Sequence, residues 1–183
     1  MNLREKNKKI AEETFEIGSV GLYETSNKEV YEATREEATI VYSSNWFLSK
    51  GLLKKNSTLV CVSGSSLKVA EKYSNVCVLN FASARNPGGG WLNGADAQEE
   101  NITRKSLLYF SLVDQKDFYF ENGMANLMYT DAIVYSRNVT VIRNENDILC
   151  PPWKASFITS AAPNLTGFQG KKLPEEIFYN RMK

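Results

Sequence analysis

The chain has 183 residues, of which 43% are hydrophobic and 23% charged, and its formal net charge is +1. This length suits one domain with a real core, because a chain of about 150 residues buries roughly two thirds of its unfolded surface. Near-neutral charge argues against non-specific DNA binding, so we expect no direct nucleic-acid partner. No apolar run approaches the roughly 18 residues of a membrane helix and no signal peptide is recognisable, so we expect a cytoplasmic protein without membrane contact.

The first half of the chain predicts a helix followed by short strands. Apolar residues recur on one face of residues 3–21, which predicts an amphipathic helix that ends near Gly18. Short strands are expected at 21–24 and 28–32, whereas the β-rich run 38–44 is too short to separate a strand from a buried helix.

Two stronger strand patterns follow, "STLVCVSG" at 57–64 and "NVCVLNFA" at 75–82. A short helix at 66–73, with Ser66 as its candidate cap, lies between them. Strand, helix and strand at this spacing suit a crossover between parallel strands, so an α/β fold is predicted.

The second half predicts another helix and further strands. Asp96 is a good N-cap and Glu99 lies three residues later, at the capping-box spacing, so a helix is expected to start near Asp96 and to run on through 101–112. The remaining segments are strands at 132–136, 139–143 and 156–162, a turn at 144–147, an extended link at 151–153 and a short helix at 174–182.

The chain contains no histidine, which excludes Ser-His-Asp and Cys-His catalysis and histidine metal sites. Its cysteines, Cys61, Cys77 and Cys150, are odd in number and lack CxxC spacing, so they form neither a zinc motif nor a disulfide framework. The first two lie in apolar runs, where a free thiol is usually a small core residue. Any chemistry must therefore use carboxylates, amides, hydroxyls, Lys, Arg or backbone groups.

A glycine-rich loop, "PGGG" at 87–90, lies between a strand and the predicted helix. This is the layout of a phosphate site, because glycines let backbone N–H groups approach an anion and the helix N-terminus adds partial positive charge. A Walker A loop is excluded because Ala95 and Asp96 follow Gly94, and a Rossmann fingerprint is excluded because position 93 is Asn. A flexible turn remains the alternative.

Two adjacent carboxylates, Glu99 and Glu100, stand at the start of the predicted helix. Neighbouring helical residues point about 100° apart, so the two cannot grip one atom, and we expect one to do the chemistry while the other orients it or the substrate. A helix N-terminus lowers carboxylate pKa values, whereas a bound diphosphate raises them. We therefore expect the acid to become competent mainly with substrate bound.

The stretch "VLNFASARNPGGGWLNGADAQEENITRKSLLY" resembles the signature of microbial-type poly(ADP-ribose) glycohydrolases, a branch of the macrodomain fold. The segments "NFASA", "PGGG" and "QEE" occur in the family's order and spacing, and the resemblance extends to about Leu165. It implies a three-layer α/β/α domain with a mixed, mostly parallel sheet. One partial domain would span 1–183, with an N-terminal helical extension at 1–35.

The resemblance also implies roles for residues. Gly88, Gly89 and Gly90 would hold the diphosphate of ADP-ribose, while Glu100 would protonate the departing ribose oxygen and then activate water. Glu99 would hold the ribose hydroxyls.

Further residues would support the site or bind the distal ribose, with Asn80 and Ser83 at the strand end and Gln98 as a support residue. Trp91, beside the glycines, is either a core residue or a ligand platform. The implied substrate is poly(ADP-ribose) or an ADP-ribosylated protein, cleaved at the ribose–ribose bond with neither metal nor cofactor.

The resemblance stops before the family's C-terminal strand and second glycine-rich loop, which would complete the diphosphate site. We therefore expect a C-terminally truncated domain with an unpaired sheet edge and an uncovered apolar face. Two alternatives to a hydrolase follow: an ADP-ribose-binding module without turnover, and an inactive fragment.

Overall fold

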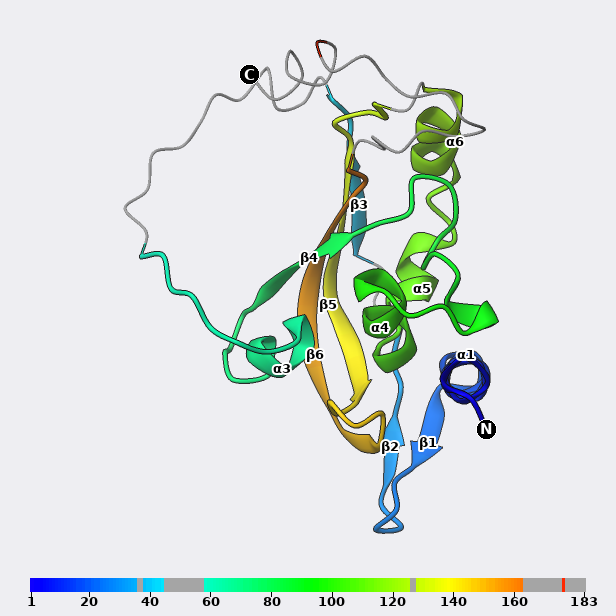
Figure 1. Cartoon of the computed structure of the whole chain (residues 1–183). Coiled ribbons are helices and arrows are strands. Elements are labelled where there is room, and N and C mark those ends of the chain that lie inside the picture. The colour runs from blue at the N-terminus through cyan, green and yellow to red at the C-terminus, as the bar shows by residue number, and fades with distance from the viewer. Residues whose placement is uncertain (36–37, 45–57, 126–127, 163–175, 177–183) are drawn as a thin grey trace.

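A computed structural model of the chain describes residues 1–35, 38–44, 58–125, 128–162 and 176. Its main sheet has four strands in the order β3-β5-β6-β4, and a separate hairpin pairs β1 with β2 (Figure 1). The strands are β1 Leu22–Glu24, β2 Val30–Glu32, β3 Thr39–Tyr42, β4 Cys77–Phe81, β5 Ile133–Arg143 and β6 Leu149–Ser160. The helices are α1 Leu3–Val20, α3 Ser66–Ala70, the 3-10 helix η1 Trp91–Asn93, α4 Gln98–Lys105, α5 Leu108–Leu112 and α6 Lys116–Met124.

The sheet is mixed, as expected, but the described strands are not mostly parallel. β4 runs parallel to β6, whereas β3 with β5 and β5 with β6 are antiparallel. The reason is local: the turn near Asn144 joins β5 directly to β6 as a long hairpin, which forces those two strands into opposite directions.

The strand predicted at 57–64 is wrong for residues 58–64, which form an extended segment outside the sheet. Leu59 is 99% exposed and Cys61 is also exposed. β4 is the outer strand of the described sheet, and an apolar run becomes a strand only where a neighbour pairs with it and covers it. The core position expected for Cys77 is also wrong, because β4 presents Cys77, Leu79 and Phe81 to solvent.

Most helices cover one face of the sheet. α1, α4, α5 and α6 lie on one side and α3 on the other (Figure 1). The core forms between the sheet and the larger group of helices, where Leu108, Val141 and Phe157 are almost completely buried. α3 begins after Ser65, which accepts a hydrogen bond from Lys68 N (3.4 Å), so the cap is Ser65 and not Ser66.

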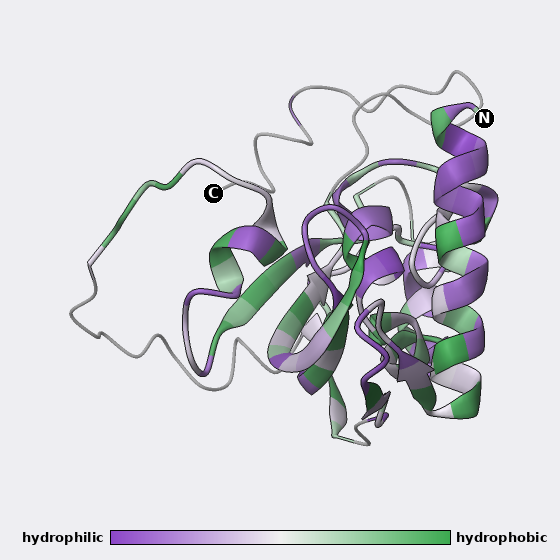
Figure 2. Cartoon of the chain, turned by 90° about the horizontal axis from the view of Figure 1, so that it is seen from below, coloured by the Kyte–Doolittle hydropathy of each residue, from purple (hydrophilic) through white to green (hydrophobic). Residues whose placement is uncertain are grey.

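The predicted N-terminal helix forms, but it passes Gly18 and ends at Val20, with Gly21 (φ 85°) as its C-cap. Gly18 lies inside the helix, and a Cβ there would overlap the Phe110 ring, so this glycine allows close packing and does not end the helix. Most of α1 is hydrophilic (Figure 2), and its buried face includes the polar Asn7 and Thr14. The helix therefore docks through close contacts and hydrogen bonds as well as apolar burial.

Segment boundaries differ from prediction at several points. The run 101–112 splits into α4 and α5, because Ser106 takes an extended conformation and bridges to Val141 of β5. The strands predicted at 132–136 and 139–143 form one strand with a bulge between Ser136 and Val139. The link at 151–153 is part of β6.

The helix predicted at 174–182 lies outside the described residues, apart from Glu176. Within the described part of the chain, no helix combines the length and the apolar character needed to cross a bilayer.

Candidate active site

Glu99 is buried at the junction of α4 and β4, where it is 3% exposed. Its Oε2 accepts a hydrogen bond from the backbone N–H of Ser83 (2.6 Å), and its Oε1 accepts one from Asn80 Nδ2 (3.4 Å). Asn80 Nδ2 also donates to Thr159 Oγ1 on β6 (3.2 Å). The carboxylate is thus oriented by the end of β4 and by the loop that follows it.

Burial raises the pKa of Glu99 from its ordinary 4.5 to about 7. The hydrogen bonds from Ser83, Asn80 and Gly88 oppose this shift, and the charge of Glu100 adds to it. The lowered pKa expected at a helix N-terminus is therefore outweighed by desolvation at this carboxyl. A buried carboxyl whose pKa is raised toward neutrality is typical of functional sites.

The Glu100 carboxyl faces the glycine loop. Its Oε1 accepts a hydrogen bond from Gly90 N–H (2.9 Å), and the side chain is 9% exposed. Its Oε2 is buried without a hydrogen-bond partner among the described residues. A buried carboxylate oxygen without a partner is costly, so this atom is available to a ligand proton or hydroxyl.

The loop needs glycine because of its backbone and its contact with Glu100. Gly88 and Gly89 have φ of 70° and 61°, in the left-handed region. A Cβ on Gly89 would overlap the Glu100 carboxyl, and one on Gly88 would lie 2.8 Å from the Trp91 ring. In this structure the Gly89 N–H donates to Asn86 O (2.9 Å) and the Gly90 N–H donates to Glu100 Oε1 (2.9 Å), so both groups already have partners within the protein.

The capping box predicted from Asp96 and Glu99 is wrong. The N-cap of α4 is Ala97, which makes no side-chain cap bond. Asp96 instead accepts a hydrogen bond from Arg104 Nη2 (2.7 Å), while Glu99 turns toward β4. The spacing was right for a cap, but the buried guanidinium and the Ser83 N–H are the stronger partners for these two carboxylates.

A set of hydrogen bonds that the sequence did not indicate connects α1 to this region; we call it the brace. Arg104, 1% exposed, donates to Ala95 O (2.6 Å) and to Asp96, and so holds the segment between the glycine loop and α4. Thr14 Oγ1 of α1 donates to Arg104 O (2.7 Å), and Arg4 Nε donates to Asn93 O (2.9 Å). Nothing in the local pattern distinguishes these residues from solvated helix positions.

Gln98 and Ser83 lie at the site in supporting positions. Gln98 Nε2 donates to Leu79 O (2.7 Å) and Gln98 Oε1 accepts from Phe81 N (2.9 Å), so the amide fastens α4 to β4. Ser83 Oγ accepts hydrogen bonds from Arg85 N (3.3 Å) and Asn86 N (3.1 Å), which shapes the start of the loop.

Trp91 is a core residue. It is 1% exposed and its ring centroid lies 5.2 Å from that of Tyr109. Because the ring is buried, Trp91 is a core residue and not a ligand platform.

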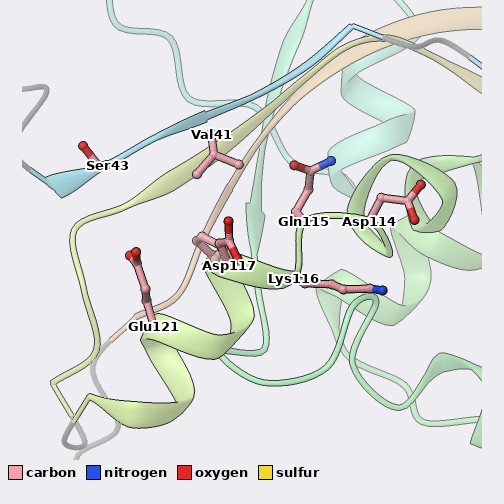
Figure 3. A pocket seen from close by; sticks show the side chains of 8 residues that line it. Val41, Ser43, Asp114, Gln115, Lys116, Asp117 and Glu121 are labelled. Carbon is pink, nitrogen blue, oxygen red and sulfur yellow. The ribbon is translucent and has the colours of Figure 1, made fainter.

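A separate hollow of about 550 Å³ lies between β3 and α6 and contains none of the predicted site residues (Figure 3). Asp114, Asp117 and Glu121 line it together with Lys116. Across the described residues, no group of three or more Cys, Asp or Glu side chains is arranged to hold a metal ion.

Comparison with known proteins identifies the family. The sequence matches the family described as microbial-type PARG, catalytic domain, over residues 11–144. No curated protein matches the sequence.

Solved structures agree. The poly(ADP-ribose) glycohydrolase (PARG) of Thermomonospora curvata superposes with TM-score 0.82 at 33% identity, over 94% of this chain and 70% of that chain. The same enzyme bound to the inhibitor ADP-HPD gives TM-score 0.82 at 32% identity, over 94% and 69% of the two chains. The Deinococcus radiodurans enzyme in complex with ADP-ribose gives TM-score 0.60 at 33% identity, over 70% and 57%.

These matches confirm the expected macrodomain-like α/β fold, and the chain spans about 70% of the length of the Thermomonospora enzyme. The match to the family over residues 11–144 includes the glycine loop, Glu99, Glu100 and the whole of β5. The chain therefore belongs to the microbial-type poly(ADP-ribose) glycohydrolase family of enzymes.

Proposed function

We propose that the protein hydrolyses the ribose–ribose O-glycosidic bonds of poly(ADP-ribose) and releases ADP-ribose, with Glu100 as general acid and base. Gly88, Gly89 and Gly90 bind the diphosphate through their backbone N–H groups. Glu99 holds the hydroxyls of the ribose that is cleaved.

The reaction proceeds in two proton transfers at Glu100. The protonated carboxyl gives its proton to the glycosidic oxygen as the bond from that oxygen to ribose C1 breaks, through an oxocarbenium-like state. The resulting carboxylate then takes a proton from water as the water oxygen bonds to C1, which returns Glu100 to its protonated form.

The observation that carries this proposal is the pairing of the Glu100 carboxyl with the glycine loop. The loop that would cradle a diphosphate touches the carboxyl that would act on the adjoining sugar, through Gly90 N–H and the close approach of Gly89. Glu99 is fixed by the Ser83 N–H and lies beside Gly89 together with Glu100, which places it to bind a hydroxyl close to the reacting carboxyl. Its raised pKa also limits the repulsion between two neighbouring carboxylates at neutral pH.

The test is release of ADP-ribose from poly(ADP-ribose) by the purified chain. Glu100→Gln keeps the shape of the side chain and removes its acid–base function, so we expect a loss of about 100-fold or more. Glu121→Gln is the matched control, since it changes an exposed glutamate of the hollow beside α6 and should leave the rate unchanged. Activity that survives in Glu100→Gln contradicts the assignment.

An ADP-ribose-binding module without turnover is the alternative function. Glu100 is 9% exposed and one of its oxygens is already bonded to Gly90, which would suit a site that binds without reacting. Calorimetry with ADP-ribose beside the release assay separates the two, because binding without release supports the module.

A further inference from the structure

Two contacts seat the first turn of α1 on the end of η1. Arg4 Nε donates a hydrogen bond to Asn93 O (2.9 Å). Gly94, the C-cap of η1, has φ 73°, and a Cβ added to it would overlap the backbone carbonyl oxygen of Arg4. The side chain and the backbone of Arg4 therefore approach two consecutive residues of the same turn.

Backbone hydrogen bonds connect this contact to the Glu100 carboxyl. Asn93 N–H donates to Gly90 O (2.9 Å), and Ala95 N–H donates to the same oxygen (3.2 Å). Gly90 N–H donates in turn to Glu100 Oε1 (2.9 Å). Because peptide groups are planar and rigid, a shift of Asn93 displaces Gly90 and, with it, the N–H that orients the Glu100 carboxyl.

The position of Arg4 is not explained by the stability of α1 itself. A positive charge in the first turn of a helix is unfavourable, because the helix dipole places partial positive charge at the same end. The bond to Asn93 O gives the guanidinium a partner outside α1, and a charged donor makes this hydrogen bond a strong one. The family match begins at residue 11, so Arg4 also lies outside the matched signature.

The same turn is held from α4 by a second guanidinium. Arg104 donates to Ala95 O (2.6 Å) and to Asp96. Arg104 is 1% exposed, so its removal would leave a cavity and two unpaired groups in the core. Arg4 is exposed and can be replaced without such damage, which makes it the residue to test.

We propose that Arg4 is a positioning residue for the proposed reaction: it holds η1 so that Gly90 N–H keeps the Glu100 carboxyl in the orientation needed for proton transfer. This inference rests on the proposed function, because it takes Glu100 as the general acid and base. Arg4 does not touch the substrate in this role. Its effect reaches the reaction through the peptide groups of Asn93 and Gly90.

The test compares Arg4→Gln with wild type in steady-state release of ADP-ribose from poly(ADP-ribose), at a temperature well below the unfolding transition. We expect kcat to fall about three- to tenfold, because one hydrogen bond that positions the carboxyl is lost. KM should stay within about twofold of wild type, because no contact with the substrate is removed. A wild-type kcat, with or without a change in KM, overturns the proposal.

Amide hydrogen exchange and urea unfolding separate positioning from a merely structural role. Arg4→Gln should speed the exchange of the backbone amides of residues 88–95 about three- to tenfold, because their support is weakened locally. The urea midpoint should stay unchanged or rise slightly, because a charge opposed to the helix dipole is gone. A lower midpoint with unchanged exchange at residues 88–95 means that Arg4 only stabilises the fold, and it overturns the proposal.

Lys6→Gln is the matched control, because it removes the same charge from an exposed side chain at the start of α1. Its kcat and its exchange should equal those of wild type. Arg4→Lys keeps a charged donor at position 4, so its kcat should lie between those of Arg4→Gln and wild type. Equal losses of kcat in Arg4→Gln and Lys6→Gln would assign the effect to net charge and overturn the proposal.

The failure of this inference differs from the failure of the proposed function. If wild type releases ADP-ribose and Glu100→Gln is inactive, equal kcat of Arg4→Gln and wild type overturns the role of Arg4 alone. If wild type releases no ADP-ribose, the proposed function and the role of Arg4 are both overturned.

Discussion

Replacing Glu99 with glutamine should make the protein more stable at neutral pH while impairing its function. Burial raises the pKa of this carboxyl to about 7, above the ordinary 4.5 that it regains on unfolding. Its contribution to stability is therefore complete below about pH 4.5 and is lost as the pH rises through about 7. Burying the charged carboxylate lowers the unfolding free energy at neutral pH, and glutamine removes this cost because it carries no charge.

The magnitude follows from the two pKa values. The difference between 4.5 and about 7 corresponds to about 3 kcal/mol of unfolding free energy at pH 7, since one pKa unit is worth about 1.4 kcal/mol. Glutamine can still accept the Ser83 N–H bond through its amide oxygen, although its NH₂ group then faces Asn80. We therefore expect Glu99→Gln to gain about 1–3 kcal/mol over wild type at pH 7.5, with the difference closing toward pH 4.5.

Urea unfolding followed by tryptophan fluorescence between pH 4.5 and 7.5 measures this difference. Glu16→Gln, which removes the same charge from the exposed face of α1, controls for net charge. ADP-ribose release should fall in Glu99→Gln and not in Glu16→Gln. The reasoning is refuted if Glu99→Gln is less stable than wild type at pH 7.5, or if the difference between the two does not change with pH.

Two further substitutions probe the glycine loop and its brace. Gly89→Ala should lower the unfolding free energy by about 1–3 kcal/mol and reduce ADP-ribose release, because φ is 61° and the new methyl group meets the Glu100 carboxyl. Gly123→Ala has open space in α6 and should stabilise by about 0.5–1 kcal/mol, so equal effects of the two would contradict the argument. Thr14→Val should lower the unfolding free energy by about 1–3 kcal/mol in urea unfolding, because Arg104 O and the buried Nε of Arg143 both lose the Thr14 hydroxyl as a partner. Thr14→Ser keeps the hydroxyl and is the control. If the valine variant is as stable as the serine variant, the Thr14 hydroxyl does not contribute to the brace.

The sequence by itself determined the helices and strands whose patterns lie within a few consecutive residues. The periodicity of α1, the β-rich runs of β4, β5 and the second half of β6, and the order of strand, glycine loop and helix were all readable, because side-chain period and glycine content act within a few residues. The run that forms β3 was too short to be distinguished from a buried helix. The family and its enzymatic class were readable for the same reason, since "PGGG" and "QEE" are short contiguous motifs.

Partner choice was decided only by the tertiary structure. Asp96 and Glu99 have capping-box spacing, yet Arg104 and the Ser83 N–H are the partners that they contact. Residues 58–64 carry a strand pattern, yet no described strand pairs with them.

The same holds for the chemistry of the site. A helix N-terminus alone lowers a carboxyl pKa, but the raised pKa of Glu99 arises from burial against β4 and the loop. Burial and hydrogen-bond competition depend on residues that are distant in the chain, as the bond from Thr14 of α1 to Arg104 O shows. Such effects exist only once the chain is folded, because a local pattern carries no information about which distant group will be the nearest.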